Sequence, residues 1–123
     1  MKKTILIVLV VVAGVLFAAN AVQKIYTGTT TDSWVATRIS VADWEDYVVA
    51  INNTGASETM SYKIDGYIVY GGTAYDALID STTLAVSTSV VPLKISNTAY
   101  GEIRVSVISL SGATTYSIEA TKK

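Results

Sequence analysis

From residue 33 onward, apolar and polar residues alternate with a period of two over short segments. Ile103, Val105 and Val107, for example, are separated by Arg104 and Ser106. Neighbouring residues of a β-strand point to opposite faces of the sheet, so this pattern predicts strands with one buried and one solvent-exposed face. The spacing of three to four residues that an amphipathic helix requires is not evident in this part of the sequence. We therefore expect a mainly β domain with antiparallel strands.

The alternating segments predict seven or eight strands, divided by residues suited to tight turns. The expected strands are 33–40, 44–52, 59–70, 74–79, 84–88, 91–95, 102–110 and 114–121. The last two would form a hairpin around Ser111 and Gly112, in which Arg104 pairs with Glu119 for at most about 1 kcal/mol. Pro92 is the only proline; it cannot donate a ladder hydrogen bond, so it should lie at a strand entrance or on an edge strand.

The stretch 100–107, with the sequence YGEIRVSV, resembles the tyrosine-bearing strand of fibronectin type III and related immunoglobulin-like modules. The resemblance covers roughly residues 33–123 and concerns architecture, because the Cys, Trp, Cys spacing of true immunoglobulin domains is missing. It implies a single immunoglobulin-like antiparallel β-sandwich in which Trp34 or Trp44 supplies the core indole. In its size and its pattern of short strands, the domain is also similar to small β-sandwich subunits of phage virions and microbial surface appendages.

The N-terminal segment has a different character. Lys2 and Lys3 precede fifteen residues, 5–19, that have no polar side chain. Such a run predicts a hydrophobic helix used for export or retained in a membrane, with the following domain on the far side of that membrane. We therefore predict three parts, which are a signal peptide or transmembrane or assembly helix over 1–26, a linker over 27–32 and a β-sandwich domain over 33–123.

Processing of this segment stays open between two interpretations. In the first, it is a signal peptide cut between Ala21 and Val22, after the small-residue motif that starts at Ala19. In the second, residues 5–22 remain as an anchor, and their helical length of about 27 Å is close to the roughly 30 Å of a bilayer core. A retained segment would contact lipid or other copies of itself, because it offers no polar face to water.

The composition excludes several classes of catalytic site. The chain has neither cysteine nor histidine, which removes thiol nucleophiles, disulfides, thiolate or histidine metal sites and Ser-His-Asp arrangements. The sequence also lacks a glycine-rich phosphate-binding motif. Ten acidic and six basic residues follow residue 24 without forming a basic stripe, so we expect no nucleic-acid binding. We also expect no enzyme activity and no cofactor.

The acidic residues leave two weaker interpretations open. Asp43 and Glu45 would project from one face of a strand as a carboxylate pair for glycoside hydrolysis, although a solvated edge explains them better. A wider set of acidic residues offers the hard oxygen ligands that calcium prefers, although no D-x-D-x-D-G loop is present. This set consists of Asp43, Glu45, Asp46, Asp76 and Asp80.

Three tyrosines, Tyr67, Tyr70 and Tyr75, lie close together beside a Gly-Gly pair. If their rings are exposed, they form an interaction surface, either for a glycan or for a neighbouring subunit. Alternating burial of Tyr67 and Val69 in a core strand is the simpler interpretation. Asn52 begins the one N-x-S/T sequence and falls in a predicted turn, which makes it a candidate glycosylation site.

These features favour a non-catalytic structural subunit of an extracellular assembly, such as a filament, surface layer or virion. The subunit would self-assemble and display its β-sandwich outside the membrane, and residues 5–22 would anchor it if they are retained. The alternative is a secreted or anchored adhesin or carbohydrate-binding module that uses the region around the three tyrosines. The expectation rests on the combination of an apolar segment with a β domain that lacks the usual catalytic side chains.

Overall fold

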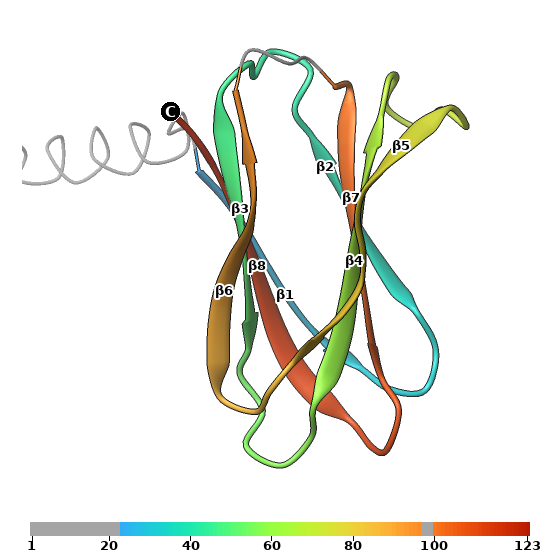
Figure 1. Cartoon of the computed structure of the whole chain (residues 1–123), viewed down its shortest axis with the longest axis vertical. Coiled ribbons are helices and arrows are strands. Elements are labelled where there is room, and N and C mark those ends of the chain that lie inside the picture. The colour runs from blue at the N-terminus through green and yellow to red at the C-terminus, as the bar shows by residue number, and fades with distance from the viewer. Residues whose placement is uncertain (1–22, 97–99) are drawn as a thin grey trace, which may run out of the picture.

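The computed structural model describes residues 23–96 and 100–123, so the predicted N-terminal helix and cleavage site lie outside the described residues. The described chain forms two antiparallel sheets of four strands each (Figure 1). The strands are β1 (Gln23–Thr30), β2 (Val35–Ser40), β3 (Tyr47–Asn53), β4 (Met60–Tyr67), β5 (Tyr75–Leu84), β6 (Thr88–Ile95), β7 (Glu102–Ser109) and β8 (Thr114–Lys122). The prediction of a mainly β, two-sheet domain is thus confirmed. None of the described residues belongs to a helix long and apolar enough to cross a membrane.

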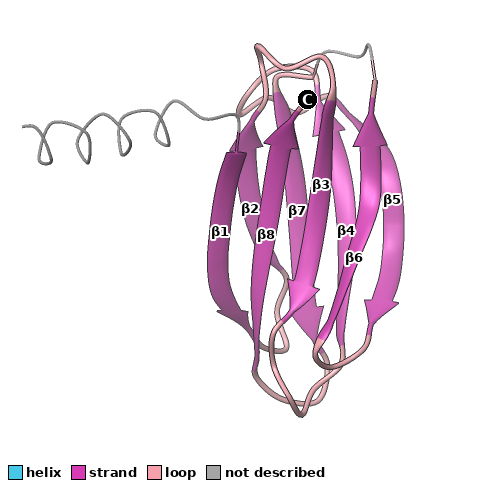
Figure 2. Ribbon diagram, turned by 90° about the vertical axis from the view of Figure 1, so that its left-hand side faces the viewer, coloured by secondary structure: helices cyan, strands magenta, loops and turns pink. Residues whose placement is uncertain are grey.

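The order of the strands is that of a jelly roll, a double-sheet fold built from two Greek keys. One sheet has the order β1-β8-β3-β6 and the other β2-β7-β4-β5 (Figure 2). Only β4 and β5 are consecutive strands of the same sheet, whereas an immunoglobulin-like domain keeps its first two strands side by side in one sheet. The prediction of an immunoglobulin-like topology was therefore wrong.

The predicted hairpin between the last two strands was also wrong. β7 lies between β2 and β4, and β8 lies between β1 and β3 in the other sheet. Arg104 and Glu119 consequently belong to different sheets, and Arg104 pairs with Glu102 instead. Alternation of polar and apolar residues cannot tell a hairpin from a crossing between two sheets, because both need only a short turn.

Strand β1 changes the predicted domain boundary. Its eight residues pair one to one with β8, from Gln23 opposite Thr121 to Thr30 opposite Thr114. The segment 27–32, predicted to be a linker, therefore contains the second half of an edge strand. The Thr30 side chain is fully buried and donates a hydrogen bond to the carbonyl of Val107 at 3.1 Å. Threonines suggest a tether by their polarity, but as β-branched residues they equally suit a strand with one inward face.

The four edge strands differ in how regularly they pair. β5 and β6 lie on one side of the sandwich (Figure 2), and the ladder of each with its neighbour shifts register. β6 also contains Pro92, which confirms its predicted position on an edge. The turn predicted at 80–81 falls at a register shift inside β5. β1 and β2 lie on the opposite side, and each pairs with its neighbour without a shift.

Apolar side chains from both sheets fill the space between them. The aliphatic residues that are 0% exposed are Ile39, Val49, Ile51, Ile64, Ile103, Val105, Val107, Ile118 and Ala120. Neither tryptophan forms the centre of the core, because Trp34 is 41% exposed and Trp44 only packs against the core from its margin. The fully buried aromatic ring is that of Tyr47, at the start of β3.

The hydroxyl of Tyr47 has no hydrogen-bond partner among the described residues, and burial strongly raises its pKa. A buried polar group without a partner loses its hydration without compensation. We therefore expect Tyr47→Phe to raise the free energy of unfolding by about 1 kcal/mol. Urea unfolding followed by tryptophan fluorescence measures this change. A loss of stability of similar size would instead mean that the hydroxyl makes a hydrogen bond.

Candidate functional site

The loop between β4 and β5, residues 68–74, gathers exposed apolar side chains at one end of the sandwich. Ile68, Val69 and Tyr70 are 65%, 63% and 53% exposed, and Tyr75 at the start of β5 is 55% exposed. These four are half of the eight large apolar side chains exposed among the described residues. Single exposed apolar residues are ordinary, but a contiguous group indicates an interaction surface. We call these four residues the apical patch.

Close contact with Gly101 fixes the backbone of this loop. The amide of Gly101 donates to the carbonyls of Tyr67 at 2.9 Å and Ile68 at 3.1 Å. A Cβ atom at position 101 would lie only 2.7 Å from the Ile68 carbonyl oxygen and the Tyr70 nitrogen. Only glycine permits this approach. The loop is therefore held against the start of β7.

A buried carboxylate lies beside the loop. Glu102 is fully buried, and its Oε1 accepts hydrogen bonds from Arg38 Nε at 2.9 Å and the Gly71 amide at 3.1 Å. Its Oε2 accepts from Arg104 Nε at 2.8 Å, and Arg104 Nη2 lies at the same distance. Gly71 has a φ of +74°, a left-handed conformation that glycine adopts without strain. The Glu102 carboxylate, Arg38, Arg104 and the Gly71 amide thus form one ion cluster.

The protonation of Glu102 follows from these contacts. Burial alone would raise its pKa, but the hydrogen bonds from Arg38, Gly71 and Arg104 outweigh burial and hold the pKa of this carboxyl below its ordinary value. The hydrogen bond to Glu102 also raises the pKa of Arg38. At neutral pH the cluster therefore contains one carboxylate and two guanidinium groups, and every charged group in it has a partner.

The arginines also contact the tyrosines of this region. The Arg104 guanidinium carbon lies 3.8 Å from the ring centroid of Tyr67, and its Nη1 donates to the Tyr67 hydroxyl at 2.8 Å. The Tyr67 ring stacks on Tyr75, with centroids 5.2 Å apart and an interplanar angle of 28°. The guanidinium carbon of Arg38, the second arginine of the cluster, lies 4.7 Å from the ring centroid of Tyr70. Each arginine therefore links the buried carboxylate to an aromatic ring.

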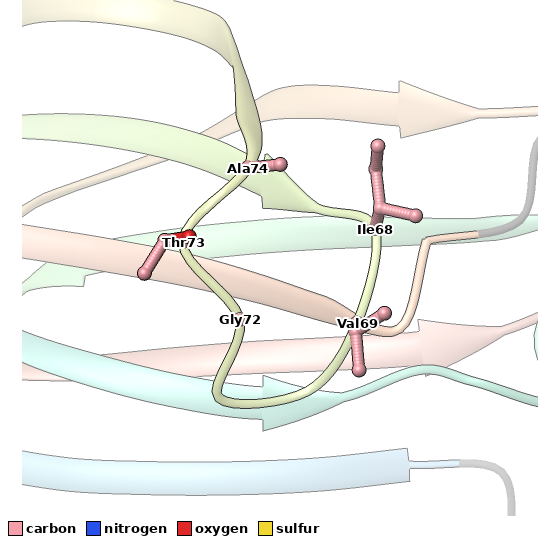
Figure 3. Close-up of a pocket in the computed structure, with 5 residues that line it drawn as sticks. All are labelled: Ile68, Val69, Gly72, Thr73 and Ala74. Carbon is pink, nitrogen blue, oxygen red and sulfur yellow. The ribbon is translucent and has the colours of Figure 1, made fainter.

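The loop encloses a shallow pocket of about 190 Å³ (Figure 3). It is lined by Ile68, Val69, Gly72, Thr73 and Ala74. All five residues come from the same loop, and none carries a charge. The pocket offers apolar contact, but it lacks the convergent polar groups that orient a small substrate.

The structure separates the three tyrosines predicted to form one surface. Tyr70 and Tyr75 are exposed, whereas Tyr67 is only 7% exposed and lies beneath Tyr75. A glycan platform would therefore have two rings instead of three. The sequence interpretation missed Glu102 and Arg38, because their contact joins residues 64 positions apart.

Asn52, the candidate glycosylation site, lies in β3 rather than in a turn. Its side-chain amide donates to Ser117 Oγ on the neighbouring strand β8 at 2.7 Å. The predicted turn starts two residues later than expected, because β3 extends to Asn53. A glycan on Asn52 would have to replace this cross-strand hydrogen bond.

The predicted calcium ligands do not come together. Within residues 23–96 and 100–123, no three acidic side chains are close enough to hold a metal ion. Asp76, one of the five proposed ligands, accepts a hydrogen bond from the Tyr100 hydroxyl at 3.1 Å. The described residues therefore give no support to a calcium site.

The sequence matches no protein-family model and no curated protein. In structure, the chain is similar to PirA, with a TM-score of 0.51, 14% identity, and coverage of 80% of this chain and 93% of PirA. It is also similar to the Yersinia pseudotuberculosis-derived mitogen, with a TM-score of 0.52, 16% identity, and coverage of 82% and 86%. The likeness to Bacillus endospore appendages is weaker, with a TM-score of 0.41, 12% identity, and coverage of 82% of this chain and 86% of the appendage chain. At these identities the likeness concerns the fold alone.

Proposed function

We propose that this protein is a non-catalytic structural subunit of an extracellular assembly, such as a filament, a surface layer or a virion. The apolar N-terminal segment supports delivery of the domain across a membrane. The jelly roll is compatible with this role, because double-sheet jelly rolls occur in capsid and lectin domains. The observation that carries the proposal is the regular edge of β1, which has neither a proline nor a register shift.

Strand β1 has the properties of an edge that can accept another strand. It makes eight consecutive pairs with β8 and contains no proline or register shift. Its outer side chains, Gln23, Ile25, Thr27 and Thr29, are exposed and uncharged. The free N–H and C=O groups of such an edge can form a ladder with a strand of another molecule. We propose that a second copy of this chain supplies that strand.

The opposite side of the sandwich is protected against this type of pairing. β5 and β6 both have irregular ladders, and β6 carries Pro92, whereas β1 has a regular ladder and its one lysine, Lys24, donates to the carbonyl of Ser40. Bulges and proline on edge strands are devices by which β proteins avoid edge-to-edge association. The contrast between the two sides supports specific assembly through β1 rather than non-specific association through any edge strand.

Ile25→Lys is expected to weaken self-association at least about tenfold, because a lysine on an edge disfavours addition of a strand. Ile25 is 58% exposed and lies opposite Glu119 of β8. The new lysine can therefore pair with Glu119, and the fold should tolerate the substitution. Analytical ultracentrifugation and electron microscopy of the full-length protein measure the assembled fraction.

Val91→Lys is the matched control, because Val91 is also an exposed apolar residue on an edge strand of the same sheet. We expect this variant to assemble like the unmodified protein. Equal weakening by both substitutions would argue against β1 as the assembly edge. A protein that stays monomeric at high concentration would contradict the proposed function itself.

A further inference from the structure

The β domain starts almost immediately after the apolar segment. The apolar run ends at Ala19, and β1 begins at Gln23. The four residue steps between them span at most about 14 Å when fully extended. If residues 5–22 stay in a bilayer, the end of the sandwich where β1 begins must therefore lie close to that bilayer.

The apical patch lies at this same end. Lys24, near the start of β1, donates from Nζ to the carbonyl of Ser40 at 2.7 Å. Ser40 lies opposite Glu102, and Glu102 lies opposite Tyr67, the last residue before the loop 68–74. Two strand spacings of about 4.8 Å separate Ser40 from Tyr67, so the loop begins about 10 Å from the end of β2. Figure 1 shows the start of β1 and the loop at the upper end of the domain.

We propose that the apical patch rests in the headgroup region of the bilayer that holds the N-terminal segment. This inference rests on the proposed function together with the second interpretation of the N-terminal segment, in which residues 5–22 are retained as an anchor. Ile68 and Val69 would enter the boundary between headgroups and acyl chains. Tyr70 and Tyr75 suit the same depth, because a tyrosine has an apolar ring and a polar hydroxyl. The contacts with Gly101 and the ion cluster fix the loop, so the patch needs no rearrangement to meet a flat surface.

The far end of the sandwich offers a natural comparison. Leu110 follows β7 directly and is 77% exposed. The eight residues of β7 extend over about 26 Å, so Leu110 lies that far from the start of β7, where the loop is held. An isolated exposed apolar residue is ordinary on a protein surface. Leu110 therefore serves as a control position that should not touch the membrane.

The test uses single cysteines, because the chain has none of its own. Full-length Val69→Cys and Leu110→Cys carry an environment-sensitive dye and are reconstituted into phosphatidylcholine vesicles with nitroxide-labelled lipid. We expect the dye at position 69 to shift to the blue and to be quenched several times more strongly than the dye at position 110. Tyr75→Cys provides a second position on the patch, with the same expected result.

Each other outcome overturns a defined part of the proposal. Weak and equal quenching at positions 69, 75 and 110 in a vesicle-bound protein would refute contact of the patch with the bilayer while leaving the anchor intact. A chain that does not float with vesicles, or a native mass that begins at Val22, would remove the anchor on which the inference depends. A blue shift at position 69 without vesicles, growing with protein concentration, would assign the patch to contact between copies of the chain.

Discussion

Glu102→Ala is expected to lower the free energy of unfolding by about 3 kcal/mol, the lower end of the range for breaking a buried ion pair. The substitution leaves Arg38 and Arg104 directly opposite each other on β2 and β7 without a counter-charge. It also removes the acceptor of the Gly71 amide. The expected loss lies at the lower end of this range because the side chains of Arg38 and Arg104 are 42% and 25% exposed and remain partly hydrated. Urea unfolding at neutral pH measures the loss.

Acidification gives this prediction a second readout. The pKa of Glu102 is lower in the folded protein than in the unfolded chain, so its carboxylate stabilises the fold above the unfolded pKa. This contribution disappears as the pH falls through the folded pKa. The difference in stability between the unmodified protein and Glu102→Ala should therefore shrink as the pH drops below about 4.

Glu119→Ala is the control for this experiment, because Glu119 was the predicted partner of Arg104. The two residues lie in different sheets, and we expect Glu119→Ala to change stability by less than about 0.5 kcal/mol. If Glu119→Ala destabilises the protein as much as Glu102→Ala, the ion cluster is not the source of the effect.

The second large effect is expected at Asn53, which is 1% exposed. Its Nδ2 donates to the carbonyls of Glu58 at 2.8 Å and Leu84 at 3.3 Å. Its Oδ1 accepts from the Gly55 amide at 3.3 Å and from Thr114 Oγ1 at 2.8 Å. All four hydrogen-bonding positions of the amide are used. Asn53→Ala leaves four buried or partly buried partners unpaired, so we expect a loss of about 3 kcal/mol in urea unfolding.

The neighbouring asparagine provides the matched control. Asn52 makes one side-chain hydrogen bond, to Ser117, from a half-buried position. Asn52→Ala should therefore cost less than about 1 kcal/mol. Similar losses for both variants would show that the cost comes from shortening an asparagine at this end of β3, and not from the hydrogen bonds of Asn53.

The sequence predicted best the strands along which burial alternates, such as β3 and β4. It missed β1, and it placed a strand at 84–88, where β5 ends and a turn leads into β6. Ile103, Val105 and Val107 all point into the core, as their spacing indicates. It predicted the topology poorly, because a short turn serves a hairpin and a crossing between sheets equally well. The choice depends on which edges pair over long distances, and β1 with β8 is the clearest example.

The candidate site was harder to predict for the same reason. The sequence pattern predicted that Tyr70 and Tyr75 could be exposed together. It did not predict the ion cluster that lies beside them. One local signal was available, because Glu102 and Arg104 are two residues apart and so share one face of β7. Arg38 could be added only by knowing that β2 lies beside β7.

The pairing of the first strand with the last has a consequence for biogenesis. β1 finds its hydrogen-bonding partner only when β8 is available, so the sheet that contains both cannot be completed until nearly the whole chain has been made. Contacts between distant parts of a chain form slowly. If the chain crosses a membrane unfolded, as the proposed function requires, this order of strands postpones completion of the β1-β8 ladder until β8 has crossed as well.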